Sequence, residues 1–293
     1  MRTGTYSIVA RDESSGELGV GVQSHWFSVG SVVTWARAGV GAVATQSVAE
    51  VAHGPNALNE MQRGTSAAQA LAAVLELDAQ ARFRQLGAVD ARGEAAAHTG
   101  DGCIPYAAHV IDRGFACQAN MMAGETVPGA MADAFRAHEG DLAERLLAAL
   151  DAAQGQGGDL RGRQSAALLV VPAGGEPWRT RFDVRVDDHP DPLAELRRQL
   201  GLARAYELAG RADELLAQGA REDARRAYVQ AAELAPEAAE LTFWAGLAIG
   251  ADDVQAGLQL VRTAAAANPA WLELLERLPA ELEPAAQSLR DAL

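Results

Sequence analysis

Two short runs near the start of the chain alternate apolar residues with polar or small ones, a pattern typical of β-strands. They span residues 5–11 and 18–24, and the polar connection between them, residues 12–17, contains Gly16. This pattern predicts an antiparallel hairpin. The alternation places Thr5, Ser7 and Val9 on one face of the first strand, so the hydroxyls of Thr5 and Ser7 point the same way.

Strand and helix patterns then alternate as far as residue 186. Strand-like runs occupy residues 32–37, 41–47, 83–90, 94–99, 107–111, 114–120, 165–171 and 182–186. Helical periodicity occupies residues 55–63, 66–77, 126–138 and 141–154, and Thr65 or Ser66 caps the second of these helices. Elements in this order can bury their apolar faces if two largely antiparallel sheets pack together and a helix pair covers the outer face of each sheet. The pattern therefore predicts an α+β fold, a four-layer αββα sandwich, although a three-layer α+β arrangement would give a similar pattern.

An all-helical region follows a linker. Residues 187–192 hold Pro190 and Pro192 among acidic residues, and such a segment neither continues a strand nor lies inside a helix. We therefore expect two domains, residues 1–188 and residues 189–293. In the second domain an internal repeat close to the tetratricopeptide period of about 34 residues relates Ala224, Tyr228, Ala231 and Pro236 to Gly257, Val261, Ala264 and Pro269. Gly257 replaces the expected alanine and fewer than two repeats are present, so the sequence predicts a small, tetratricopeptide-like helical-hairpin module.

Composition excludes several classes of function. All 25 cationic residues are arginine, which excludes a Walker A lysine, a pyridoxal-phosphate Schiff base and a Ser-Lys dyad. The formal charge of -14 does not favour a nucleic-acid partner. The six histidines show no HxH or HxxxH spacing and the two cysteines form no CxxC pair, so we expect no metal and no cofactor. Because the sequence has neither a signal-peptide pattern nor 18 consecutive apolar residues, we expect a cytoplasmic protein without a membrane partner.

Thr5 is the first candidate for catalysis, because it lies at the head of the first strand near the N-terminus. As a free N-terminal residue it would supply both the attacking hydroxyl and the α-amine that takes its proton. In the chain as encoded the four residues 1–4 precede it, so its amine lies in a peptide bond. The alternative interpretation is an ordinary β-strand threonine.

The other candidates lie at strand ends and in one loop. Ser7 shares the face of Thr5, and Ser24 ends the next strand beside His25, which leaves a Ser/His arrangement open. The side-chain amides of Gln46 and Asn120 are suited to stabilise an oxyanion, or else they cap strand ends. A further strand ends at His98 and Thr99 and would reach the same rim. In the loop after residue 155, the candidate ligand-binding residues are Asp159, Arg161, Arg163 and Gln164. The two guanidinium groups of this loop would cradle a carboxylate. The alternative is a solvated loop in which Asp159 pairs with Arg161.

The sequence resembles the domain of unknown function 1028 family. The resemblance rests on residues 5–12, 35–46, 97–100, 115–120, 158–167 and 185–190, in order, and extends from residue 5 to about residue 200. It implies the αββα fold of N-terminal nucleophile hydrolases, in which a Thr, Ser or Cys at the head of the first strand is exposed by self-cleavage or by removal of methionine. Gly4 resembles the usual residue before such a cleavage site. Typical relatives begin Met-Thr, whereas Met1-Arg2 here does not allow simple methionine removal to expose Thr5. Some members of the family carry a C-terminal extension described as peptidoglycan-binding, and the helical tail here resembles it in position.

Two hypotheses follow. The first is an amidohydrolase acting on a small, carboxylate-bearing amide, with Thr5 as nucleophile, Gln46 or Asn120 at the oxyanion, and Arg161 with Arg163 on the carboxylate. The second is a non-catalytic receptor for a small ligand or cell-wall fragment on the same fold. We expect a homo-oligomer, for which a dimer is the simplest form, with the helical tail in protein contact or bound to a peptidoglycan fragment.

Overall fold

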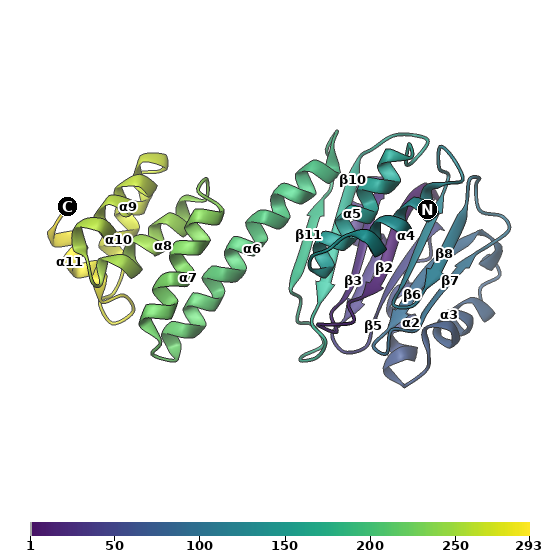
Figure 1. Cartoon of the computed structure of the whole chain (residues 1–293), viewed down its shortest axis with the longest axis horizontal. Coiled ribbons are helices and arrows are strands. Elements are labelled where there is room, and N and C mark those ends of the chain that lie inside the picture. The colour runs from purple at the N-terminus through teal and green to yellow at the C-terminus, as the bar shows by residue number, and fades with distance from the viewer. Residues whose placement is uncertain (1) are drawn as a thin grey trace. The chain divides into compact units, whose positions relative to one another are not determined.

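The computed structural model describes residues 2–293, and side chains from Gly4 onward. The chain divides into two compact units, Met1–Arg197 and Arg198–Leu293 (Figure 1). The division falls inside one long helix, α6 (Pro192–Ala217). Each unit is described below by itself.

The first sheet of the N-terminal unit has five antiparallel strands. Its order is β1-β5-β6-β7, and β4 pairs with the same edge of β5 as β1 does. The strands are β1 (Arg2–Thr3), β4 (Thr34–Arg37), β5 (Gly41–Val48), β6 (Arg84–Asp90) and β7 (Ala95–Thr99).

The second sheet has six antiparallel strands in the order β11-β10-β3-β2-β9-β8. The strands are β2 (Thr5–Arg11), β3 (Leu18–Ser24), β8 (Ala108–Asp112), β9 (Phe115–Asn120), β10 (Ser165–Val171) and β11 (Phe182–Val186). The predicted hairpin is confirmed, with Thr5 opposite Ser24 and Arg11 opposite Leu18. On the other side of β2, Thr5 lies opposite Asn120.

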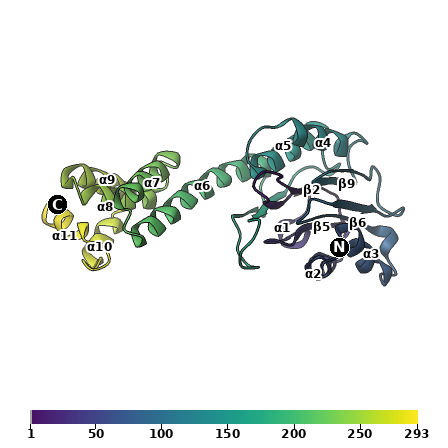
Figure 2. The ribbon, with the colours of Figure 1, turned by 60° about the horizontal axis from the view of Figure 1, so that its bottom comes forward.

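Helices cover the outer faces of the two sheets (Figure 2). Helices α2 (His53–Gln62) and α3 (Ala67–Glu76) pack on the first sheet, through residues such as Leu58, Leu71 and Leu86. Helices α4 (Val127–Ala137) and α5 (Leu142–Gly155) cover the second sheet. Capping boxes start two of these helices, at Ser66 and at Asp141, which satisfies amide groups that the first turn leaves without partners.

The inner faces of the two sheets enclose a single apolar core. It is built mainly from small and β-branched side chains, which suit a narrow space between pleated surfaces. Its fully buried members include Val9, Leu18, Val20, Val22 and Val89. This core fills only the half of the inter-sheet layer that is remote from Thr5.

Two local predictions were wrong or incomplete. Val32 and Val33 belong to a one-turn helix, α1 (Gly30–Val33), and not to the predicted strand 32–37, which begins only at Thr34. The reason is tertiary: a Cβ on Gly30 would lie 2.5 Å from the Cβ of Ala167, so this turn fits closely against β10. The two-residue strand β1 was not predicted, because two residues carry no periodic signal. A short 3₁₀ helix, Ala81–Phe83, precedes β6.

The C-terminal unit is entirely helical, with α7 (Arg221–Leu234), α8 (Ala239–Gly250), α9 (Val254–Ala267), α10 (Ala270–Arg277) and α11 (Ala285–Asp291) after α6. The helical repeat positions in α7 and α9 are buried. Glycine at position 257 has a steric cause, because a Cβ there would lie 2.5 Å from the Gly246 carbonyl oxygen and from the Gly250 Cα. Within residues 2–293, no helix combines the length and the apolar character needed to cross a bilayer.

Candidate active site

The inter-sheet layer changes from apolar to polar toward the end where β2 begins. The change occurs in seven strands of both sheets, and their register brings the polar positions together. The inward-facing polar residues at this end are Thr5, Ser7, Ser24, Gln46, Gln85, Thr99, Gln118, Asn120 and Ser165, and the same strands carry Val9, Val22, Ala44, Val89, Ala97, Ala116 and Ala167 toward the other end. A buried polar group costs free energy unless it is hydrogen-bonded, so a concentration of this kind calls for a functional explanation.

The Thr5 hydroxyl takes part in a short hydrogen-bond relay. Its Oγ1 donates to Ser24 Oγ at 3.1 Å, and Ser24 Oγ in turn donates to the carbonyl oxygen of Gly4, which forms the peptide bond to Thr5. Both side chains are fully buried. The hydroxyl of Thr5 is therefore connected, through the hydroxyl of Ser24, to the carbonyl group of the preceding residue, Gly4.

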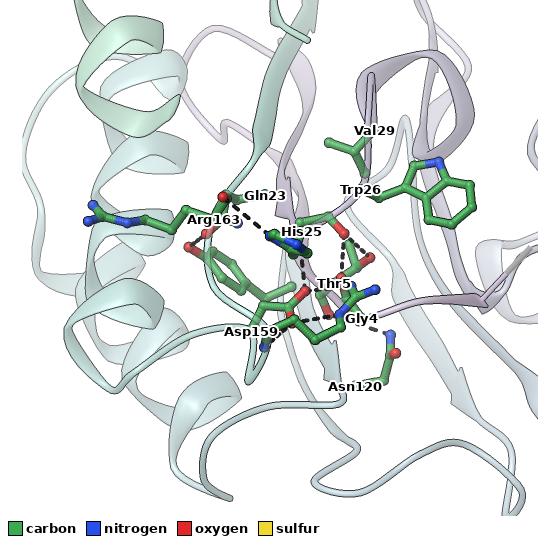
Figure 3. Close-up of polar contacts among 12 residues, drawn as sticks. Gly4, Thr5, Gln23, His25, Trp26, Val29, Asn120, Asp159 and Arg163 are labelled. Atoms are coloured by element: carbon green, nitrogen blue, oxygen red, sulfur yellow. Dashed lines mark hydrogen bonds and ion pairs between the residues drawn. The ribbon is translucent and has the colours of Figure 1, made fainter. Parts of the chain in front are cut away.

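A second donor reaches the same carbonyl from the loop before β10. Arg161 Nη2 donates to the Gly4 carbonyl oxygen at 3.0 Å. The guanidinium is held by Asp159, through Nη2 to Oδ2 at 2.8 Å and Nε to Oδ1 at 3.1 Å. The side chain of Asp159 is entirely buried and also accepts from the backbone amide of His25 at 3.0 Å (Figure 3). The Gly4 carbonyl thus receives two donors, and one of them is a positioned cation.

The loop that carries these residues is fastened on both sides of Thr5. On one side Leu160 donates its backbone amide to Met121, just after β9, at 3.1 Å. On the other side the backbone amide of Gln164 donates to the carbonyl of Ser24, at the end of β3, at 3.2 Å. The loop therefore spans the strands that flank β2 and presents Arg161 to its first peptide bond.

Side-chain amides fill the polar half below Thr5. Gln46 Nε2 and Asn120 Nδ2 reach the Thr5 carbonyl oxygen, at 3.3 and 3.5 Å, and both donate to Gln85 Oε1, at 2.8 and 3.0 Å. Ser7 Oγ donates to Gln46 Oε1 at 2.6 Å and accepts from Gln118 Nε2 at 2.7 Å. Gln46 and Asn120, predicted as oxyanion donors, thus contact the carbonyl of Thr5 itself, and Ser7 lies inside the network without access to solvent.

The network leads to the surface through Thr99. Gln85 Nε2 donates to Thr99 Oγ1 at 2.9 Å, and Thr99 Oγ1 lies 2.8 Å from Nδ1 of the exposed His109. Partial burial and the nearby charge of His98 lower the pKa of His109 below its usual value, which favours the neutral ring. On the outer face of β2, burial and the charges of Asp151 and Asp159 raise the pKa of Tyr6 well above its usual value, so this phenol keeps its proton. Its hydroxyl contacts Gln23 Oε1 and lies 3.1 Å from Gln154 Oε1.

Two residues beside this network have left-handed backbones. Ser47 follows Gln46 with φ of 70°, and Met121 follows Asn120 with φ of 60°. Left-handed conformations of residues other than glycine are uncommon and cluster at functional sites. Here they occur at the ends of the two strands that supply the amides facing Thr5.

The other predicted residues lie outside the contacts around Thr5. His98 points to the helix-covered face of the first sheet and its Nε2 lies 3.1 Å from the Ala81 carbonyl oxygen. The ring of His25 is on the surface, 3.4 Å from the Arg163 carbonyl oxygen. Arg163 pairs with Asp191, and the Gln164 amide donates to Asp188, both at the exposed surface. Of the predicted pair of arginines, only Arg161 reaches Gly4.

Two contributors were not predicted, namely Gln85 and Gln118. A signal for both exists in the sequence, since a glutamine in an otherwise apolar strand marks a buried polar position. Gly87 provides a second signal, because a Cβ there would lie 2.1 Å from Gln118 Oε1. Within the part of the chain that the structure describes, no group of three His, Cys, Asp or Glu side chains is arranged to hold a metal ion.

Comparison with known proteins identifies the family. The model of the Family of unknown function (DUF1028) matches residues 5–196. The chain belongs to this family. Among solved structures it is similar to the DUF1028 protein SPO2555 from Silicibacter pomeroyi, with 31% identity and a TM-score of 0.61, over 67% of this chain and 88% of that chain. No curated protein matches the chain.

A weaker similarity joins the DUF1028 region to Anbu (ancestral beta-subunit) from Yersinia bercovieri. The identity is 13% and the TM-score 0.33, over 67% of this chain and 93% of that chain. The predicted family is confirmed. The hydrolase activity and the tetratricopeptide-like character of the tail stay predictions.

Proposed function

We propose that the DUF1028 region is an amidohydrolase with the αββα sandwich of N-terminal nucleophile hydrolases, and that Thr5 is its nucleophile after scission of the Gly4–Thr5 peptide bond. One observation carries the proposal. The carbonyl of Gly4 accepts hydrogen bonds from Arg161 and from Ser24, and Ser24 is also the hydrogen-bond acceptor of the Thr5 hydroxyl. A carbonyl held by a cation and a hydroxyl next to a buried nucleophile is arranged for attack.

Scission begins when Thr5 Oγ1 adds to the carbonyl carbon of Gly4. Ser24 accepts the hydroxyl proton of Thr5 and passes its own proton toward the Gly4 oxygen, while Arg161 stabilises the negative charge that develops there. The C–N bond then breaks as this proton moves from the Gly4 oxygen to the amine of Thr5, and Gly4 remains as an ester on Oγ1. One water hydrolyses the ester and releases the segment of residues 1–4 with a C-terminal carboxylate.

The same groups serve the mature site. The free amine of Thr5 becomes the base for its own hydroxyl. Gln46 and Asn120 hold the Thr5 carbonyl and so fix the orientation of the nucleophile. The oxyanion donors in this proposal are therefore Arg161 and Ser24, in place of the two amides suggested by the sequence.

A carboxylate-bearing amide remains the substrate class that this site favours. Departure of Gly4 frees one N–H of Arg161, while Asp159 keeps the guanidinium in place through two bonds. The bidentate fork of arginine suits carboxylates. Arg163 lies at the surface in the same loop, paired with Asp191, where it can meet a more distant charge on the substrate.

Intact-mass measurement of the purified chain over time tests the proposal. Wild type should convert to a form that begins at Thr5, Thr5→Ser should retain conversion, and Thr5→Ala should abolish it. Thr45→Ala is the matched control, because Thr45 is equally buried and its hydroxyl contacts only the Glu50 carbonyl, at 3.1 Å. If wild type keeps all of residues 1–4 while it hydrolyses amides, the mechanism is wrong; if it binds small carboxylates or muropeptides without turnover, the receptor hypothesis gains support.

A further inference from the structure

Residues 2–4, just before Thr5, occupy the place where the acyl part of a substrate must lie. Gly4 presents its carbonyl to Arg161 and Ser24, and the residues before it form β1. β1 pairs antiparallel with the edge of β5, with Thr3 opposite Ser47 and Arg2 opposite Val48. Before scission, the chain therefore displays its own first substrate, bound in an extended conformation.

The space around Gly4 excludes a side chain at the scissile position. A Cβ at Gly4 would lie 2.8 Å from Arg161 Nη2, 2.9 Å from Met121 Sδ and 3.0 Å from Asp159 Oδ2. Met121 can change its rotamer, since the methionine side chain is flexible. Arg161 can move away only by giving up its bond to the Gly4 carbonyl or to the fully buried Asp159. A side chain would therefore displace the cation that the reaction needs.

The segment before Gly4 pairs with the edge of a sheet, namely with β5. This edge of β5 already pairs with an extended segment, β1, and after residues 1–4 depart another extended chain could take the same place. Strand addition provides affinity through main-chain bonds, and selectivity then comes from the positions where side chains meet pockets.

We propose that the substrates are extended peptides or peptide-like amides cleaved after glycine, with the residues before the glycine added as a strand to β5 at Ser47 and Val48. The hydrolytic part of this inference rests on the proposed function, whereas the binding part does not. Thr5 Oγ1 adds to the glycyl carbonyl, the C–N bond breaks with a proton transferred to the leaving amine, and water releases a glycyl carboxylate.

Binding of the product peptide tests the inference without catalysis. The protein is a Thr5→Ala chain that lacks residues 2–4, which lie outside the family match, and a thermal unfolding curve like that of the full Thr5→Ala chain checks that it folds. The probes in calorimetry are acetyl-Arg-Thr-Gly, acetyl-Arg-Thr-Ala and acetylglycine. We expect the alanine peptide to bind about tenfold to one-hundredfold more weakly than the glycine peptide, as overpacking predicts. Acetylglycine should also bind more weakly, because it lacks the strand. Equal affinities for the glycine and alanine peptides, or no binding of the glycine peptide, would overturn the inference.

A second measurement uses the full chain. In a Thr5→Ala background, which prevents scission, Gly4→Val should detach β1 and increase the rate of tryptic cleavage after Arg2 at least about tenfold, since the side chain cannot be accommodated beside Arg161. An unchanged tryptic rate would show that the site accepts a side chain. Should wild type prove uncleaved while both measurements give the expected results, the proposed function fails and the glycine-specific peptide site stands.

Discussion

The two halves of the inter-sheet layer are built from the same strands and differ in chemistry. The half around Val20 and Leu18 is dry and packed with aliphatic side chains. The half around Thr5 contains hydroxyls and amides that bond to one another across the two sheets. In the first half each side chain stabilises the fold because it is buried away from water. In the second half each side chain is oriented by the hydrogen bonds that it makes.

This difference has a cost in the polar half. Among the described residues, Gln118 Oε1 and Asn120 Oδ1 are buried without a hydrogen-bond partner. A buried acceptor of this kind costs about 1–3 kcal/mol. The polar half therefore reduces stability in a place where aliphatic side chains would have served the fold, which favours a role in orienting Thr5.

The largest effect should come from Arg161, which contacts the Gly4 carbonyl from the polar half. Loss of one oxyanion donor typically slows a reaction by about 10²–10³-fold, and we expect Arg161→Gln to slow scission by that factor. Arg161→Lys should recover part of the rate, because it keeps the charge but not the fork that Asp159 holds. Intact mass against time measures both rates. Arg163→Gln is the control, and a comparable slowing there would mean that net charge, and not the contact with Gly4, matters.

A change in the dry half should affect stability and leave scission intact. Leu18 is fully buried at the end of β3 remote from Ser24, and Leu18→Ala should lower the free energy of unfolding by about 2–5 kcal/mol. Urea unfolding measures the loss. Below the melting transition the rate of scission should match that of wild type. A large fall in this rate would indicate that the two halves are not independent.

The smallest effect on stability should come from Gln118→Met. The substitution removes an unpartnered acceptor together with the bond from Nε2 to Ser7, so stability should stay within about 1 kcal/mol of wild type or rise. Scission should slow, because Ser7 and Gln46 lose a group that orients them below Thr5. Urea unfolding and intact mass on the same sample give both quantities. Unchanged scission with unchanged stability would remove the amide network from the mechanism.

The sequence was sufficient to predict most helices and strands, and also the turns, caps and loops whose residues are consecutive in the chain. The turn at residues 12–17, the cap at Ser66 and the glycine-rich loop around Asp159 each depend on neighbours in the sequence, so their patterns are visible there. The hairpin that sets Thr5 opposite Ser24 was predicted, because its two strands and their turn are consecutive in the sequence.

What the sequence could not provide is register between strands that are distant in the chain. Gln85 and Gln118 become part of the site only because pairing sets them beside Gln46 and Ser7. A single step of alternation decides whether His98 or Thr99 faces inward, and the structure places Thr99 there. At Val32 and Val33 the β-branched side chains favour a strand locally, and packing against β10 overrides that preference.

The junction at Gly4 has a practical consequence for handling the protein. β1 belongs to one sheet and β2 to the other, and Gly4 is the covalent link between them. An affinity tag fused ahead of residue 1 would therefore be retained only by molecules in which this bond is intact. If the Gly4–Thr5 bond is cleaved as proposed, a preparation purified through such a tag selects the precursor, whereas a tag after residue 293 collects precursor and mature chains alike.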